Sequence, residues 1–165
     1  MHRLLPLLLI AFLATGLAAC GDDEDEKTEK FTVDSKVGRT LVLEDNGRRG
    51  NSPGDERVFT QNLVDPESGD PVGRLDGTVT VTAQQRSAGR VNEYRVGTIQ
   101  FTLDGGTLVS SGVYIADPES FVPNQGVKRP IVGGTGKYKG ASGEVTQRPI
   151  AGGEIGNAFD IRLPD

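Results

Sequence analysis

The sequence predicts an all-β domain whose short antiparallel strands close into a barrel or pack as a sandwich. No amphipathic helical period of useful length occurs between about residue 35 and the last residue, 165. Several runs instead alternate apolar and polar residues with the two-residue period of a strand. The 23 glycines and repeated turn-forming clusters separate these runs, as expected for strands joined by hairpins and short loops.

Eight strands are predicted in chain order, at residues 37–44, 57–64, 72–85, 94–103, 107–116, 130–132, 143–148 and 157–163. The clearest period lies in the third strand, where Val79 and Val81 alternate with threonines. In the fourth strand the apolar phase changes across Gly97, which predicts a β-bulge at that glycine. Residues 45–55 and 117–128 are predicted to be loops because turn-forming residues dominate them.

The first 19 residues are predicted to be a signal peptide rather than part of the fold. A basic Arg3 precedes an apolar run, and small residues lead to Cys20. The ending Leu17-Ala18-Ala19-Cys20 resembles the lipobox of bacterial lipoproteins, which implies a lipidated Cys20. The protein is therefore expected to be secreted across the cytoplasmic membrane and lipid-anchored at the cell envelope. An ordinary signal peptide with an unrelated cysteine is the alternative.

The mature chain is acidic, and its acids gather at one end. Removal of Arg3 leaves 17 basic residues against 23 acidic residues. Residues 22–30 carry six acids and two lysines, so residues 20–34 are predicted to form a solvated acidic tether, followed by a barrel domain at 35–165. The remainder is nearly neutral and has no basic patch, which argues against nucleic acid as a partner.

Two absences limit the chemistry. The single histidine, His2, lies in the signal peptide, and the single cysteine is Cys20. No His-dependent triad, thiol nucleophile, His/Cys zinc site or disulfide is therefore expected in the mature protein, and no metal or cofactor is predicted.

A glycine-rich stretch, IVGGTGKYKGASGEV, covers residues 131–145. It superficially resembles a phosphate-binding loop, but Ile131 and Tyr138 stand where that motif requires Gly and Ser or Thr. The glycines are instead expected to let the chain turn sharply between late strands. Tyr138 is expected to pack over this turn.

Four segments carry a family resemblance: GDERVFTQNL (residues 54–63), PVGRLDGTVTV (71–81), GGTLVSSGVY (105–114) and VGGTGKYKGASGEV (132–145). Together they resemble the allene oxide cyclase barrel and, more distantly, the dirigent proteins. The resemblance implies an eight-stranded antiparallel β-barrel with an elongated apolar cavity, assembled as a homotrimer. Plant members cyclise an allene oxide of a fatty acid, mainly by holding it in one conformation. The implied partner is a hydrophobic small molecule or oxidised lipid.

The resemblance also implies roles for individual residues. Glu44 falls at the catalytic carboxylate, and Asn46, Ser52 and Pro53 fall at groups that hold an ordered water. Gln61, in place of a family Asn, falls at a position that affects how the water is held. The pocket positions are Val79 (in place of a plant-enzyme Cys) and Tyr114. Taken by themselves, the same residues allow plainer interpretations: Glu44 as a solvated acid, the next three as turn formers, and Tyr114 as a core residue.

Four functions are consistent with these observations. The first is an isomerase-like cyclase acting on an oxidised lipid or similar apolar epoxide. The second is a non-catalytic barrel that binds a hydrophobic ligand, and the third is dirigent-like steering of radical coupling. The fourth is a structural envelope protein whose barrel is filled by side chains.

Overall fold

The computed structural model describes residues 27–36, 40–45, 52–87, 89–116 and 126–164. These residues form strands β1 (Lys27–Lys36), β2 (Thr40–Glu44), β3 (Glu56–Val64), β4 (Pro71–Ser87), β5 (Arg90–Leu103), β6 (Gly106–Ala116), β7 (Val127–Gly136), β8 (Ser142–Pro149) and β9 (Ile155–Leu163), with a 3₁₀ turn η1 (Ala151–Gly153) before β9.

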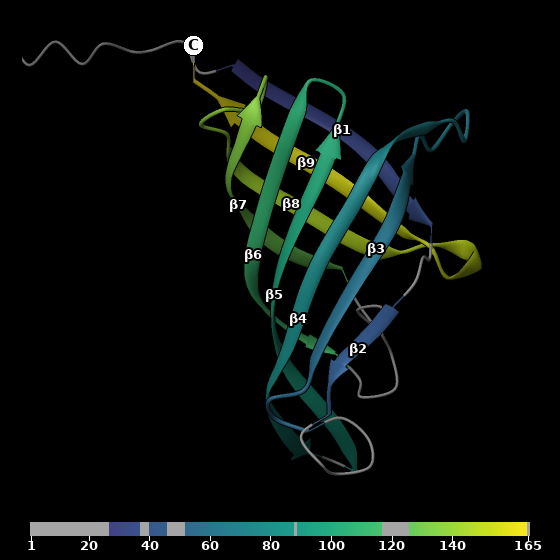
Figure 1. Ribbon diagram of the computed structural model, residues 1–165, viewed down its shortest axis with the longest axis vertical. Helices are drawn as coiled ribbons and strands as arrows, with labels where there is room; N and C mark the ends of the chain where they lie inside the picture. Colours follow the sequence, from purple (N-terminus) through teal and green to yellow (C-terminus); the bar gives the residue numbers. More distant parts are fainter. Residues whose placement is uncertain (1–26, 37–39, 46–51, 88, 117–125, 165) are drawn as a thin grey trace, which may run out of the picture.

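All the strands belong to one antiparallel sheet that closes on itself (Figure 1). Neighbours along the chain pair from β2 to β9, and β9 pairs with β1. The ring closes because β1 pairs with the last residues of β3, whereas β2 pairs with its first residues. β1 and β2 thus share one side of β3, which leaves eight positions around the ring. The prediction of an all-β, eight-stranded antiparallel barrel is confirmed.

β1 corrects the predicted domain boundary, because residues 27–34 are part of the barrel and not of an acidic tether. β1 pairs along its length with β9, from Lys27 opposite Leu163 to Ser35 opposite Ile155. Although β1 is rich in charged residues, its side chains alternate between the interior and the solvent. Val33 and Ser35 are buried, while Lys30 faces outward and forms an ion pair with Asp160 at 2.8 Å. A strand with one solvated face accommodates this many charges.

The bulge predicted at Gly97 is also wrong. β5 runs without a register shift past Gly97, and the irregularity lies in its partner β4, between Val81 and Ala83. The inward positions of β5 continue from Phe101 and Ile99 through Gly97 to Arg95 and Glu93, all of them buried. The apparent phase change arose because two charged residues occupy inward positions while Tyr94 and Val96 face outward.

The glycine-rich stretch forms the hairpin between β7 and β8, as predicted. Gly136 adopts a φ of 61°, and a Cβ on it would lie 2.1 Å from the carbonyl oxygen of Gly105 in the adjacent hairpin. Tyr138 is buried under this turn, and its ring stacks at 6.3 Å from that of Phe31. β7 is longer than the predicted three-residue strand because it pairs through these glycines.

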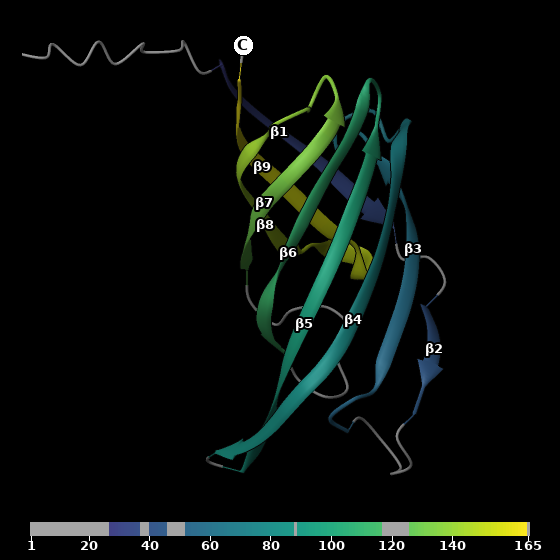
Figure 2. The ribbon, with the colours of Figure 1, turned by 60° about the vertical axis from the view of Figure 1, so that its left-hand side comes forward.

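The interior differs between the two ends of the barrel. The end with the β5–β6 and β7–β8 turns is filled by aromatic rings: Phe31 stacks on Phe159 at 4.7 Å, and Phe101 meets Phe159 edge-on at 4.9 Å. At the opposite end the long β4–β5 hairpin projects beyond the other strands (Figure 2). The buried polar side chains of β5 and β7–β9 lie toward this second end.

Candidate functional site

A pocket lies inside the barrel between the aromatic end and the β4–β5 projection. Its lining contains six apolar or aromatic residues and three polar ones: Phe59, Leu75, Val79, Ile99, Tyr114 and Ile155, with Gln61, Arg129 and Gln147. The centre of a water molecule can move through about 20 Å³ of this space. That is room for about one water, so the pocket is narrower than the elongated apolar cavity implied by the family resemblance.

A hydrogen-bonded relay fixes the polar side of the pocket. Arg129 Nη1 donates to Gln147 Oε1, and Gln147 Nε2 donates to Asn157 Oδ1 at 2.7 Å. Asn157 Nδ2 is anchored in turn on the backbone carbonyls of Val33 and Ile155, both at 3.1 Å. All three relay side chains are buried, so the guanidinium is held by a chain of contacts that crosses β7, β8, β9 and β1.

Arg129 also lies over the ring of Tyr114, with its Cζ 4.3 Å from the ring centroid. This geometry is a cation–π contact, which partly offsets the loss of hydration of the guanidinium. Burial lowers the pKa of Arg129 from its ordinary value, and the neighbouring Tyr114 opposes that shift. The group still carries its positive charge at neutral pH, because an arginine does not deprotonate in this range.

Three buried polar atoms in the described part of the chain lack a hydrogen-bond partner: Gln61 Oε1, Ser110 Oγ and Arg129 Nε. Two of them, on Gln61 and Arg129, belong to pocket-lining residues that are only 4% and 3% exposed. Buried polar groups are normally paired, so an unpaired acceptor and an unpaired donor on one pocket indicate a place for a polar guest.

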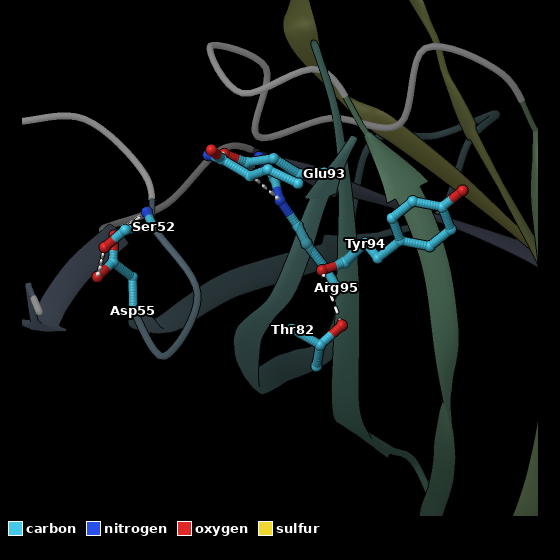
Figure 3. A network of polar contacts seen from close by, with 7 residues as sticks. Ser52, Asp55, Thr82, Glu93, Tyr94 and Arg95 are labelled. Atoms are coloured by element: carbon cyan, nitrogen blue, oxygen red, sulfur yellow. Dashed lines mark hydrogen bonds and ion pairs between the residues drawn. The ribbon is translucent and has the colours of Figure 1, made fainter. Parts of the chain in front are cut away.

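Glu93 and Arg95 form a fully buried ion pair next to the pocket, with Arg95 Nη2 2.7 Å from Glu93 Oε2 (Figure 3). Arg95 Nε donates to the same oxygen at 2.9 Å, and Gln84 Nε2 donates to Glu93 Oε1 at 3.0 Å. Arg95 lies opposite Tyr114 in the β5–β6 register. The nearby Arg57 has a lowered pKa because of burial and then because of repulsion from Arg95.

The turn before β3 is closed by Ser52 and Asp55 (Figure 3). The Ser52 backbone N–H donates to Asp55 Oδ2 at 2.6 Å, and Ser52 Oγ donates to Asp55 Oδ1 at 2.9 Å. The turn is fastened to β4 by backbone hydrogen bonds from Gly54 N to the carbonyl of Val81 and from Val81 N to the carbonyl of Asp55. These contacts give Ser52 a structural partner.

The structure brings together three of the predicted site residues: Gln61, Val79 and Tyr114 all line the pocket. The predicted carboxylate, Glu44, is exposed at the end of β2 opposite Glu56 and does not line this pocket. Pro53 is exposed in the turn described above. Asn46 and Cys20 lie outside the described residues.

Five buried polar residues of the site were not predicted from the sequence: Arg129, Gln147, Asn157, Glu93 and Arg95. The signal that identifies them is the two-residue period. Arg129 is in phase with Ile131, and Gln147 is in phase with Val145. Residue type alone does not predict this inward placement, because charged side chains normally lie on the solvent face.

The described segments contain no cluster of three or more His, Cys, Asp or Glu side chains that could hold a metal ion. No helix within the same segments is long and apolar enough to cross a membrane.

The chain belongs to the allene oxide cyclase barrel-like domain family, whose model matches residues 33–161. No curated protein sequence matches the chain significantly. The family match covers β2 to β8, most of β9 and the last four residues of β1.

Solved structures share the fold at low sequence identity. A pyocyanin demethylase superposes with a TM-score of 0.64 at 22% identity, covering 81% of this chain and 99% of that one. The Diels-Alderase AbmU from Streptomyces koyangensis has a TM-score of 0.60 at 21% identity, covering 89% and 72%. The pterocarpan synthase dirigent protein GePTS1 has a TM-score of 0.54 at 22% identity, covering 84% of each chain. At these identities the similarity shows the fold alone.

Proposed function

We propose that this protein binds a small molecule inside its barrel, with the apolar body of the ligand against Phe59, Val79 and Ile99 and a polar group beside Arg129. The pocket carries this proposal, because it combines an apolar lining with two unpartnered buried polar atoms. Small-molecule sites commonly have this composition of apolar walls and a few placed polar groups. The narrow space favours a compact ligand, or one of which only the end enters this pocket.

Native mass spectrometry of the protein purified from its own host tests the proposal. We expect a co-purifying small molecule that dissociates on unfolding. Val79→Phe should abolish it, because Val79 is 2% exposed and lines the pocket. Val132→Phe is the matched control, since Val132 is 60% exposed on the outer face of β7. A protein without ligand, and without thermal stabilisation by a library of small acids, epoxides and lipids, would favour a filled structural barrel instead.

Cyclisation is the second candidate function. It is supported by membership of the cyclase barrel family and by the Diels-Alderases that share the fold. A rigid pocket promotes ring closure by restricting the substrate to a reactive conformation. In this hypothesis the substrate is an oxidised lipid or an apolar epoxide, and Glu44 supplies the carboxylate.

A freshly generated allene oxide provides the test of cyclisation. Cyclase activity predicts one enantiomer of the cyclopentenone product, and a racemic product identical to that in buffer would exclude it. Glu44→Gln should lose this selectivity if the carboxylate participates. Unchanged selectivity in Glu44→Gln would remove Glu44 from the mechanism while leaving the activity in place.

The location is also part of the proposal: a lipoprotein anchored through Cys20 at the cell envelope, supported by the signal-like residues 1–19 and the lipobox-like ending. Metabolic labelling with a radioactive fatty acid tests it. We expect label on the wild-type protein and none on Cys20→Ser. Equal labelling of both proteins would contradict the anchor.

A further inference from the structure

Arg129 is a buried cation without a carboxylate partner among the described residues. Its side chain is 3% exposed, and its recorded partners are the amide of Gln147 and the ring of Tyr114. Both partners are neutral. An arginine this deeply buried is normally paired with a negative group, because a charge withdrawn from water is costly without one.

The neighbouring charges do not supply the missing anion. Glu93 is the fully buried carboxylate next to the pocket, and both of its oxygens are already engaged by Arg95 and Gln84. The charge of Arg95 is balanced by Glu93, and the carboxylates of Glu93 and Asp55 also act on the nearby Arg57. None of the residues that line the pocket carries a carboxylate to balance the charge of Arg129.

The pocket presents Arg129 in a fixed orientation. The Gln147–Asn157 relay holds Nη1, and Tyr114 covers one face of the guanidinium. Nε remains without a partner. A guanidinium held in this way is prepared to donate to an oxygen anion, because the entropy of ordering the side chain has already been lost.

Gln61 provides the second contact. Its Oε1 is buried on the same pocket and has no hydrogen-bond partner. An acceptor and a cationic donor on one pocket match a ligand that carries both an anionic oxygen and a hydroxyl or N–H group. A wholly apolar ligand would leave both buried atoms unpaired.

We propose that the ligand of this barrel carries an anionic oxygen, a carboxylate or a phenolate, that binds Arg129, and that Gln61 accepts a hydrogen bond from an adjacent donor on the same ligand. This inference rests on the proposed binding function and assigns the charge of the ligand. It distinguishes the site from one that takes a neutral epoxide or hydrocarbon alone.

Calorimetric titration of the full-length protein with salicylate, salicylamide and hexane-1,2-diol tests the assignment. Salicylate combines a carboxylate with an adjacent hydroxyl, and salicylamide replaces the charge by an amide of the same shape. We expect salicylate to bind at least about tenfold more tightly than salicylamide, since a charged hydrogen bond is stronger than a neutral one. Arg129→Met should remove this difference, whereas Arg148→Met, which changes an exposed arginine on β8, should preserve it.

A second readout does not depend on a variant. In the wild-type protein the Arg129 Nε–H resonance should shift with salicylate and not with an equal concentration of chloride. Equal affinities for salicylate and salicylamide, or binding of the diol alone, would overturn the anion assignment and leave the binding function standing. Failure of all three probes, together with the absence of a co-purified ligand, would overturn both.

Discussion

Glu93 and Arg95 are both withdrawn completely from solvent on β5, two residues apart on the inward face of the strand. Each charge is tolerated because the other lies 2.7 Å away. Removing one partner leaves the other as a buried charge, which costs far more than removing both. Replacing one member of this pair is therefore expected to lower the free energy of unfolding more than replacing both members.

We expect Glu93→Leu to lower the free energy of unfolding by about 3–5 kcal/mol, because Arg95 would remain buried without its carboxylate. The double variant Glu93→Leu/Arg95→Met should be closer to the wild type than the single variant. Denaturant unfolding followed by circular dichroism measures both. A double variant as unstable as the single one would show that lost packing, not the orphaned charge, dominates.

Asp34 makes the stability of the fold depend on pH, and the direction follows from its raised pKa. Burial raises its pKa, and repulsion from Glu154 and Asp65 adds to the shift. A carboxyl whose pKa is higher in the folded state than in the unfolded state holds its proton more tightly when folded. The stability that it contributes is therefore lost as pH rises above the unfolded value of about 3.9.

Asp34→Asn should accordingly stabilise the protein at pH 7 by less than about 1 kcal/mol, since water still reaches the group, and the gain should disappear by pH 3. Asp65→Asn is the contrasting variant, because backbone N–H groups of Ser68 and Glu67 lower the pKa of Asp65. It should destabilise at pH 7. Thermal unfolding across pH 3–7 tests both signs, and a benefit of Asp34→Asn that persists at pH 3 would contradict the electrostatic cause.

At the scale of elements, the β7–β8 hairpin depends on Gly136. Its φ of 61° disfavours a side chain, and an added Cβ would lie 2.1 Å from the Gly105 carbonyl oxygen. Gly136→Ala should therefore lose more than about 2 kcal/mol of stability. Gly152→Ala is the control: it has a φ of 80° with nothing within 4 Å, so backbone strain alone should cost about 1 kcal/mol. Equal losses in the two variants would show that the close approach to Gly105 is relieved by movement.

β1 is the element that closes the ring, because it pairs with both β9 and β3. A chain beginning at residue 27 keeps the strand and should retain the melting temperature of the longer protein. A chain beginning at Ser35, the predicted start of the barrel, should aggregate or unfold, because β9 would present an unpaired edge. A stable, monomeric protein from Ser35 onward would show that the barrel folds without the first residues of β1, as expected of a tether.

At the scale of the whole molecule, the outer face of β5 and β6 exposes apolar side chains: Val96, Val113 and Ile115. Val96 and Val113 lie opposite each other in the register, and Ile115 follows on the same face of β6. We propose that this face contributes to a homotrimer of the kind that the family resemblance implies. An apolar surface of this kind is a candidate for subunit contact.

Val113→Asp should then shift the protein from trimer to monomer in sedimentation velocity, because a charge would be buried at each contact. Ile150→Asp changes an exposed apolar residue in the β8–β9 connection and should leave the assembly unchanged. A wild-type protein that sediments as a monomer would contradict the trimer, and an unchanged trimer in Val113→Asp would place the contact on another face.

The sequence by itself determined the all-β class, the order of most strands and the hairpin at Tyr138, because these depend on local properties: alternation, turn residues and glycine. Three pocket residues, Gln61, Val79 and Tyr114, were identified through the family resemblance. The sequence did not determine the inward placement of Glu93, Arg95 and Arg129, since a charge is solvated unless distant strands bury and pair it. Only the closed barrel decided that Arg129 meets Tyr114 and Gln147, because ring closure brings residues from separate strands into one interior.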